Sequence, residues 1–509
     1  MLADIGGYGN HVRERETKFL IKQGRKLPAP DKLLDGLGRF SVEEVDQDAV
    51  YFDTPDLRLT RAGASLRYRS DDGWTVKLPE VGGDTLVRDE LTFGGDNEGG
   101  PPGEAVSLVR ALARSAPLEP VAKVKTHRRK IHVCDPDGRP IGEIDDDEVR
   151  TSARAAPSTR FHEIEFEVQE GADQRLVKAV LQRLRRLGAK PTRGVPKVAR
   201  ALGGAASKEP DLAPPDGLDP KGGLEELVRT AIAASAHRLV TNDPVVRLGE
   251  DPEGVHQARV ATRRLRSDLR TFRPVLDTDW SEPLRAELKW LGELLGRVRD
   301  QDVLRELLTA RADALRPGQH ARALSLIRRL DEQRAGDRAA LLHAMDSPRY
   351  LALLDQLVDG AHAPRLRAGQ HSRRHTRSRV ARLVRKPWRR LRDAIRLLPA
   401  EPADVELHEV RKRAKQARYA LEATAPVLGK PATRLAKRLA SLQDVLGAHQ
   451  DAVVAAAWLH DAALDSDDTE AAFVAGELAE SFGAERRHVR RTWWLQWKRA
   501  KRAHAKQAA

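Results

Sequence analysis

The sequence predicts a multidomain α+β protein, with an N-terminal antiparallel β tunnel or barrel and a C-terminal all-α duplicated helical bundle. Three observations support this prediction. Short runs of alternating apolar and polar residues, separated by turn residues, fill most of residues 11–170. A stretch rich in Pro, Gly, Asp and Ala follows. After residue 224, Ala, Leu, Arg and Glu dominate, and apolar residues recur at helical spacing.

These composition changes place a first domain at residues 1–203, a linker at 204–223 and a helical domain at 224–509. The chain of 509 residues is long enough for a sizeable core in each domain. The formal net charge is +14, and charges nearly balance over residues 1–200, so the helical domain carries almost all of the excess. Such a domain is expected to meet a polyanion: nucleic acid, an anionic membrane or polyphosphate.

The single cysteine, Cys134, excludes an intrachain disulfide, which fits a reducing compartment. The N-terminal residues lack the apolar run of a signal peptide, and no stretch of about 18 uncharged apolar residues occurs. We therefore expect a cytoplasmic protein without a membrane span.

The predicted strands carry their charges in alternation. In Glu14-x-Glu16-x-Lys18, a strand would place both carboxylates and the ammonium on one face. The same parity groups further charged residues: Arg67 with Arg69, Arg88 with Glu90, Asp145 with Glu143 and Asp147, and Glu163 with Glu165 and Glu167. An open sheet with one solvated face explains any single strand. A closed barrel with a polar lumen explains the whole set better.

A lumen of this composition suits phosphate chemistry. Clustered carboxylates repel one another unless a divalent cation neutralises them, and hard oxygen ligands favour Mg²⁺ or Mn²⁺. Arginine and lysine side chains, including Lys77, suit phosphate oxygens. Metal on one side and cations on the other is the arrangement that cleavage of a phosphoanhydride requires.

Residues 10–203 resemble the CYTH family, also called triphosphate tunnel metalloenzymes. The resemblance rests on an ordered set of motifs: Glu14-x-Glu16-x-Lys18, Tyr51-Phe52-Asp53-Thr54-Pro55, Leu66-Arg67-Tyr68-Arg69, Lys77, Arg88-x-Glu90, Lys125-Thr126-His127-Arg128-Arg129, Glu143-Ile144-Asp145-Asp146-Asp147 and Glu163-x-Glu165. It implies an eight-stranded antiparallel tunnel that binds a triphosphate, and an enzyme that hydrolyses triphosphates or cyclises ATP.

The resemblance also implies roles for single residues. Glu14, Glu16 and Lys18 would be catalytic. Divalent metal, Mg²⁺ or Mn²⁺, would bind Glu14, Glu16, Asp145, Glu163 and Glu165. Substrate phosphates would contact Lys18, Arg67, Arg69, Lys77, Arg88, an arginine at 128 or 129, and Lys197. We favour Arg128 over Arg129. Lys197 follows the last strand, and a solvated surface lysine is the competing interpretation.

Two histidine-led cationic stripes mark the helical domain. His256, Arg259, Arg263 and Arg266 are spaced 3, 4 and 3, and His408, Arg411, Lys415 and Arg418 repeat this spacing. Like charges at these spacings destabilise an isolated helix, so the stripes need an anion or acidic neighbours. A solvated face is the usual explanation of one such stripe, but the duplication argues for a ligand.

These motifs resemble the CHAD family, the conserved-histidine α-helical domains. The match runs over residues 224–500 and includes Leu295-Gly296-x-x-Arg299-Asp300-x-Asp302. It implies two pseudo-symmetric helical bundles whose basic residues bind inorganic polyphosphate. The expected ligands of the helical domain are thus bound by His256, Arg259, Arg263, Arg266, His408, Arg411, Lys415 and Arg418.

The resulting hypothesis is metal-dependent hydrolysis of inorganic triphosphate or polyphosphate in the tunnel, with polyphosphate held by the helical domain. A non-catalytic protein that targets polyphosphate granules is the alternative, and a cyclase on the same barrel stays open. Nucleic-acid binding is a weaker hypothesis, because no known nucleic-acid motif appears.

Overall fold

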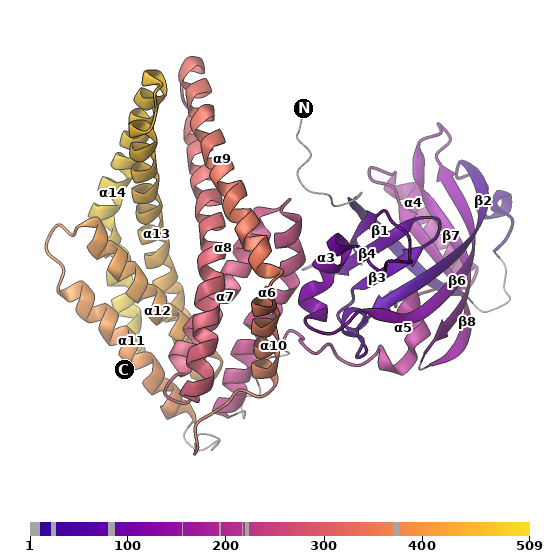
Figure 1. The fold of residues 1–509 in the computed structure, drawn as a ribbon, viewed down its shortest axis with the longest axis horizontal. Helices are drawn as coiled ribbons and strands as arrows, with labels where there is room; N and C mark the ends of the chain where they lie inside the picture. Colours follow the sequence, from indigo (N-terminus) through magenta and orange to yellow (C-terminus); the bar gives the residue numbers. More distant parts are fainter. Residues whose placement is uncertain are drawn as a thin grey trace. The chain divides into compact units, whose positions relative to one another are not determined.

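The computed structural model describes residues 11–21, 27–79, 87–154, 156–192, 195–215, 217–218, 223–369 and 376–508, with the backbone alone for 11–16, 87–89 and 506–508. The chain divides into two compact units, Met1–Ala213 and Pro214–Ala509. The first is the tunnel unit and the second is the helical unit, and each is described by itself (Figure 1).

The tunnel unit is built on one antiparallel sheet (Figure 1). The strand order is β5-β4-β3-β2-β6-β7-β8-β1-β9. β1 pairs with β8 along its second half and with β5 along its first, so the order returns to its starting strand. Among the described residues the strands are β1 (His11–Ile21), β2 (Arg39–Asp53), β3 (Ser65–Arg69), β4 (Gly73–Pro79), β5 (Val87–Phe93), β6 (Glu119–Cys134), β7 (Pro140–Ala153), β8 (Ala156–Val168) and β9 (Lys190–Pro191).

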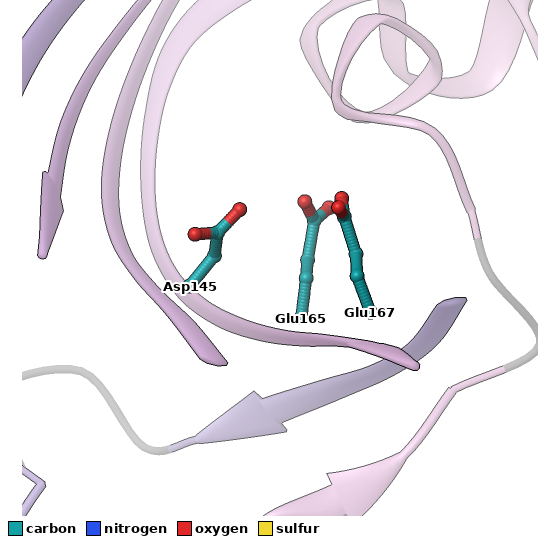
Figure 2. Close-up of side chains that lie close together, drawn as sticks. All are labelled: Asp145, Glu165 and Glu167. Atoms are coloured by element: carbon teal, nitrogen blue, oxygen red, sulfur yellow. The ribbon is translucent and has the colours of Figure 1, made fainter. Parts of the chain in front are cut away.

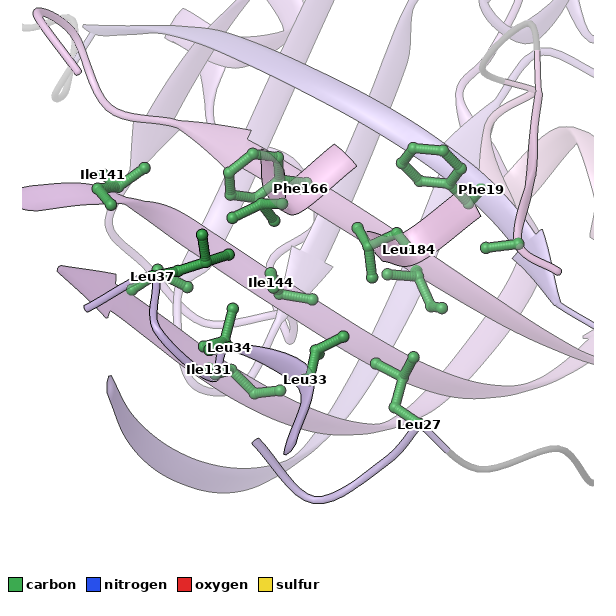
Figure 3. Packing of buried hydrophobic residues seen from close by; sticks show 14 of the residues in the cluster. Phe19, Leu27, Leu33, Leu34, Leu37, Ile131, Ile141, Ile144, Phe166 and Leu184 are labelled. Carbon is green, nitrogen blue, oxygen red and sulfur yellow. The ribbon is translucent and has the colours of Figure 1, made fainter. Parts of the chain in front are cut away.

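The outer face of the strands carries the apolar core. Ile164 and Phe166 of β8 alternate with its three glutamates and are fully buried. They pack with Ile144 of β7 and with α4 (Gln174–Arg186), which contributes Leu184 (Figure 3). Burial of each large apolar side chain stabilises the fold by about 1.5–3 kcal/mol. Because side chains alternate along a strand, this packing turns the other residues of each strand, which include the charged ones, toward the interior. The other helices of this unit are α1 (Pro30–Leu33), α2 (Arg58–Arg61), α3 (Gly103–Ala113) and α5 (Lys197–Leu202).

The short helix α5 packs against the inner face of the sheet. Its residues Val198 and Ala201 lie in a buried cluster with Tyr51 of β2, Val124 of β6 and Val149 of β7. Each of these three strand residues lies on the same face of the sheet as charged residues farther along its strand. The docking of α5 therefore places its first residue among those charges.

The helical unit contains two runs of consecutively packed helices. In the first, α6, α7, α8 and α9 pack in order, and in the second α11, α12, α13 and α14 do the same. The runs meet through α7 with α12, α8 with α13 and α9 with α14. The helices are α6 (Leu224–Leu248), α7 (Pro252–Phe272), α8 (Thr278–Ala312), α9 (Pro317–Met345), α10 (Pro348–His362), α11 (Thr376–Arg396), α12 (Asp404–Leu428), α13 (Lys430–Leu464) and α14 (Thr469–Ala508).

Local sequence sets where the first cationic helix begins. The Asp251 side chain accepts a hydrogen bond from the Glu253 amide at 2.8 Å, and Pro252 occupies the first turn of α7. Upstream, Gly249 ends α6 in the left-handed region at φ 73°. The histidine-led stripe therefore starts one turn into a well-capped helix.

Two equivalent glycines support the duplication. A Cβ atom at Gly296 of α8 would lie 3.8 Å from the Arg259 guanidinium, and one at Gly447 of α13 would lie 3.7 Å from that of Arg411. At both positions an arginine of the neighbouring helix thus lies at ordinary van der Waals distance from the site of the Cβ atom. In the described part of the chain, no helix has both the length and the hydrophobicity needed to cross a bilayer.

We predict that Gly142→Ala destabilises the tunnel unit. A Cβ atom at Gly142 in β7 would lie 2.2 Å from the backbone oxygen of Glu167, so β8 would have to move. The free energy of unfolding should fall by about 1–3 kcal/mol, measured by chemical denaturation of the full chain. Gly99→Ala is the control, because its Cβ atom would meet open space. Equal stability of the two variants would contradict this account of the β7–β8 pairing.

Candidate functional site

The inner face of the tunnel unit encloses a cavity of about 380 Å³. Seven residues predicted to bind phosphate or metal line it: Lys18, Arg67, Arg69, Lys77, Arg128, Glu165 and Lys197. They come from five different strands and from α5, and strand alternation turns their side chains inward. The sequence interpretation of Lys197 as a solvated surface lysine is excluded, since its side chain is only 12% exposed.

Three carboxylates gather at this cavity: Glu165 and Glu167 line it, and Asp145 is buried beside them. Asp145 of β7 and Glu165 and Glu167 of β8 bring one oxygen each within 4.8 Å of one another (Figure 2). Asp145 is fully buried, and burial raises its pKa to about 8, with Arg128 opposing the rise and Asp147, Glu143 and Glu167 adding to it. Its charged form is therefore costly unless a further cation is close.

Arg128 and Lys197 hold the neighbouring carboxylates. The Arg128 guanidinium donates to both oxygens of Asp147 at 2.8 and 2.7 Å and to Glu165 at 3.2 Å, and it contacts Asp145. The Lys197 ammonium donates to Asp147 at 2.6 Å and to Glu165 at 3.1 Å. Lys18 also pairs with Glu165. Burial opposes ionisation of Glu165, but Lys18, Lys197 and Arg128 hold its pKa well below the usual range.

A second cationic group lies on β3 and β4. Arg67 is 3.2 Å from Glu90 of β5, and Lys77 pairs with the other oxygen of Glu90. Burial would raise the pKa of Tyr51, but the adjacent Arg67 guanidinium lowers it overall. Arg69, nearer the edge, pairs with Asp71 at 3.0 Å. Arginine and lysine side chains thus line the cavity on more than one side, and their partners are carboxylates.

Not every predicted site residue joins this cavity. Glu163 lies against Arg200 of α5 at 3.2 Å and 3.8 Å from Lys197, outside the three-carboxylate cluster. Burial raises the pKa of Glu163 to about 7. The side chains of Glu14, Glu16 and Arg88 lie outside the described residues. In the backbone register, Glu14 pairs with Arg88 and Glu16 with Glu167.

The structure adds three acidic residues that the predicted site omitted. Asp147 forms ion pairs with Arg128 and Lys197, and Glu90 forms ion pairs with Arg67 and Lys77. Glu167 is the third member of the carboxylate cluster. Strand parity was the signal for these, because each lies two residues from a predicted site residue on the same strand. Tyr51 belongs to a motif of the sequence, but parity alone gives no reason to select it.

The carboxylate cluster has the chemistry of a site for a hard divalent cation. Its potential ligands are carboxylate oxygens, which Mg²⁺ and Mn²⁺ prefer. Both oxygens of Asp145 are buried and meet no hydrogen-bond donor with acceptable geometry among the described residues, although Arg128 is in ion-pair contact. A divalent cation would satisfy these oxygens and offset their burial. The residues present therefore fit the group that the CYTH resemblance implies.

The helical unit has a second basic cavity, of about 360 Å³, which we call the histidine cavity. The first three residues of each predicted stripe line it: His256, Arg259, Arg263, His408, Arg411 and Lys415. The fourth residue of each stripe does not. Arg266 approaches Gly292 of α8, and Arg418 borders a neighbouring pocket. Arg299 and Gln450 also line the histidine cavity, and neither was predicted to bind ligand.

Cations outnumber carboxylates in the histidine cavity. Arg259 pairs with Asp300 at 2.7 Å, and the second carboxylate is Asp451. His408 contacts Gln450 through Nδ1 at 2.5 Å. Burial and the surrounding arginines lower the pKa of Lys415 to about 7. Burial, with Arg299, also lowers the pKa of His256. An anion in this cavity would reverse both effects.

Comparisons with known proteins agree with both units. A CYTH domain model matches residues 12–199, and a CHAD domain model matches residues 230–460. The uncharacterized protein Rv2226 of Mycobacterium tuberculosis is 32% identical over 503 residues, covering 92% of this chain and 91% of that protein.

Two solved structures are similar to part of the chain. PptA from Streptomyces chartreusis has 26% identity and a TM-score of 0.46, and the match covers 54% of this chain and 98% of PptA. The CHAD domain of Ricinus communis has 25% identity and a TM-score of 0.42, over 58% of this chain and 96% of that domain. Given the two matched domains and the near full-length relative, this chain belongs to the family of proteins in which a CYTH domain is followed by a CHAD domain.

Proposed function

We propose that the tunnel unit hydrolyses inorganic triphosphate or the ends of polyphosphate chains, and that the helical unit binds polyphosphate. CYTH domains bind triphosphate substrates, use divalent metals and include triphosphatases and cyclases. The observation that carries the proposal is the tunnel cavity, which Glu165 and Glu167 line together with Lys18, Arg67, Lys77, Arg128 and Lys197, and beside which Asp145 completes the carboxylate cluster.

The tunnel residues divide into two roles. Asp145, Glu165 and Glu167 would hold Mg²⁺ or Mn²⁺, joined by Glu14 and Glu16 if the CYTH resemblance extends to them. When bound there, a divalent ion would neutralise phosphate charge and polarise the scissile phosphoanhydride. Lys18, Arg128 and Lys197 would bind phosphate oxygens on one side, with Arg67 and Lys77 on the other.

Substrate binding would add phosphate contacts to cations that are already paired with carboxylates. Arg67 and Lys77 share Glu90, while Arg128 and Lys197 share Asp147. Each of these cations has more donors than its carboxylate partner uses, so it could contact phosphate while keeping that partner. The carboxylates would hold the cations in place for the charge that develops in the transition state.

The helical unit contributes binding rather than chemistry in this proposal. Among the described residues that line the histidine cavity there is no serine, threonine or cysteine that could pair with a general base as a nucleophile. Polyphosphate held there would raise the local concentration of chain ends. A protein that only binds polyphosphate would hold the polymer but release no phosphate. An assay of phosphate release from tripolyphosphate with Mg²⁺ or Mn²⁺ therefore distinguishes an enzyme from a binding protein.

We predict that Asp145→Asn weakens metal binding without loss of the fold. Asparagine has nearly the shape of a protonated aspartate but lacks the charge. The Mn²⁺ concentration for half-maximal phosphate release should rise by at least about tenfold, and calorimetric titration of the protein with Mn²⁺ should show the same loss.

Asp146→Asn is the matched control, since Asp146 pairs with His162 and Arg129 and is not part of the carboxylate cluster. If both variants kept the wild-type metal dependence, the carboxylate cluster would not be the metal site.

We also predict that Arg67→Ala lowers kcat/KM for tripolyphosphate by roughly tenfold to a hundredfold, because a charge-assisted contact to phosphate contributes about 1.5–3 kcal/mol. Steady-state kinetics of phosphate release measures the effect. Arg150→Ala, at an exposed position of β7 in the same unit, should leave kcat/KM unchanged. Intact kinetics in Arg67→Ala would assign this arginine a structural role only.

The lowered pKa of Lys415 predicts a pH dependence of polyphosphate binding. The amine is largely protonated below pH 7 and becomes neutral above it, while bound phosphate would raise its pKa. Binding then takes up a proton, so affinity should fall as pH rises from 7 to 9, by at most about tenfold per pH unit. The charged or titratable groups around it are Arg259, Arg263, Arg411, Arg418, Arg299, Asp300, Asp451, His256 and His408.

Isothermal titration with long-chain polyphosphate, in chelator to prevent turnover, tests this dependence. Lys415→Met should bind more weakly at pH 7 and lose most of the decline between pH 7 and 9. An unchanged slope in Lys415→Met would assign the titration to another group.

A further inference from the structure

A third cavity, of about 570 Å³, adjoins the histidine cavity in the helical unit. It lies between α6, α7 and α12, and we name it the arginine–tyrosine pocket after Arg238, Arg263, Arg264, Arg418 and Tyr419, which line it. Val260 and Arg263 line both cavities. The two cavities therefore adjoin at these residues.

Three guanidinium groups surround the Tyr419 ring. The Arg418, Arg264 and Arg263 guanidinium carbons lie 4.7, 5.4 and 5.8 Å from the ring centroid. Tyr419 is only 5% exposed, so it serves as a fixed surface against which the arginines lie. Arginines held in this way present their N–H groups with little loss of side-chain entropy on binding.

The carboxylates of the pocket only partly match these arginines. Glu422 pairs with Arg264 and is 3.5 Å from Arg418, and Asp268 is 3.2 Å from Arg264. Within the described part of the chain, neither Arg263 nor Arg238 has a carboxylate at ion-pair distance. Arg238 is exposed at the edge of the pocket. An anion could therefore reach unpaired cations there without displacing an existing pair.

The cavity on the other side of the histidine cavity has the opposite character. It measures about 410 Å³ and shares Arg411 and Asp451 with the histidine cavity. Its further charged residues are Asp444 and Glu485, and Glu485 pairs with Arg311 at 2.6 Å. A polyanion that extends beyond the histidine cavity would therefore meet less positive charge on this side than on the side of the arginine–tyrosine pocket.

We propose that long inorganic polyphosphate chains run from the histidine cavity past Arg263 into the arginine–tyrosine pocket, which selects for chain length. This inference rests on the proposed polyphosphate binding of the helical unit. A chain that fills only the histidine cavity would not reach Arg238 or Arg418, whereas a longer chain would gain contacts with both. Affinity should then increase with chain length in a way that depends on these two residues.

The test compares tripolyphosphate with long-chain polyphosphate by calorimetry on the full chain, in chelator. All proteins carry Arg67→Ala and Lys77→Ala to weaken the tunnel. Adding Arg238→Gln and Arg418→Gln should reduce affinity for the long chain by about tenfold or more, lower its salt dependence, and change affinity for tripolyphosphate by less than about twofold.

Arg434→Gln with Arg438→Gln is the matched control, because both are exposed arginines of α13 and the change in net charge is the same. It should leave the dependence on chain length intact. Arg238→Gln alone removes an exposed side chain without an ion-pair partner among the described residues, so it tests the pocket even if the double variant folds poorly.

Equal losses for both chain lengths, or an equal loss in the control, would overturn the pocket while leaving polyphosphate binding in place. A gain in long-chain affinity from Asp444→Asn, with no effect of Arg238→Gln, would show that the chain leaves on the other side and overturn it too. Failure of the parent protein to bind either chain would overturn the proposed function itself.

Discussion

Pairing of buried charges inside the tunnel is the constraint on which the rest of this unit depends. An isolated ion in the interior costs several kcal/mol, so the inward-facing residues can stay charged only in compensating groups. Glu90 with Arg67 and Lys77 makes one such group, and Asp147 with Arg128 and Lys197 makes another. Asp145 and Glu163 are less well compensated: burial raises the pKa of Asp145 to about 8, with Asp147, Glu143 and Glu167 adding to the rise, and burial raises the pKa of Glu163 to about 7. The same balance that allows the interior to fold thus leaves carboxylates that a bound cation would stabilise.

Buried charges in the helical unit are less well paired than those in the tunnel unit. Arg263 and Lys415 lie at equivalent positions of the two repeats, and neither has a carboxylate within ion-pair distance among the described residues. Burial and cationic neighbours lower the pKa of both. Their charges therefore weigh against the unliganded state, and a polyanion would relieve this cost on binding. The tunnel contains nearly matched charges, whereas the histidine cavity keeps an unmatched positive charge for its ligand.

Sequence patterns predicted which residues share a face but not how far a site extends. Strand parity placed Glu163 and Glu165 together, yet Glu163 faces Arg200, because the docking of α5 on the inner sheet decides that contact. Helical spacing selected four residues in each stripe, and only the first three of each reach the histidine cavity. The fourth residues have other neighbours: Arg266 approaches Gly292 of α8, and Arg418 lines the arginine–tyrosine pocket. No periodicity within one helix can reveal which neighbouring helix a side chain meets.

Because the two repeats differ in sequence, the surroundings of the histidine cavity differ on its two sides. The residues of the histidine cavity largely correspond: His256 to His408, Arg259 to Arg411 and Asp300 to Asp451. Farther along the helices the correspondence is only partial: Arg266 still matches Arg418, but Arg264 and Asp268 of α7 are replaced by Gln416 and Ala420 at the equivalent positions of α12. Two matching repeats would offer a ligand the same surroundings at both ends of the cavity. Here the arginines around Tyr419 gather on one side, and Asp444 and Glu485 lie on the other. Symmetry therefore explains the cavity, and in the proposed binding mode the loss of symmetry beside it would set which way a polyanion extends.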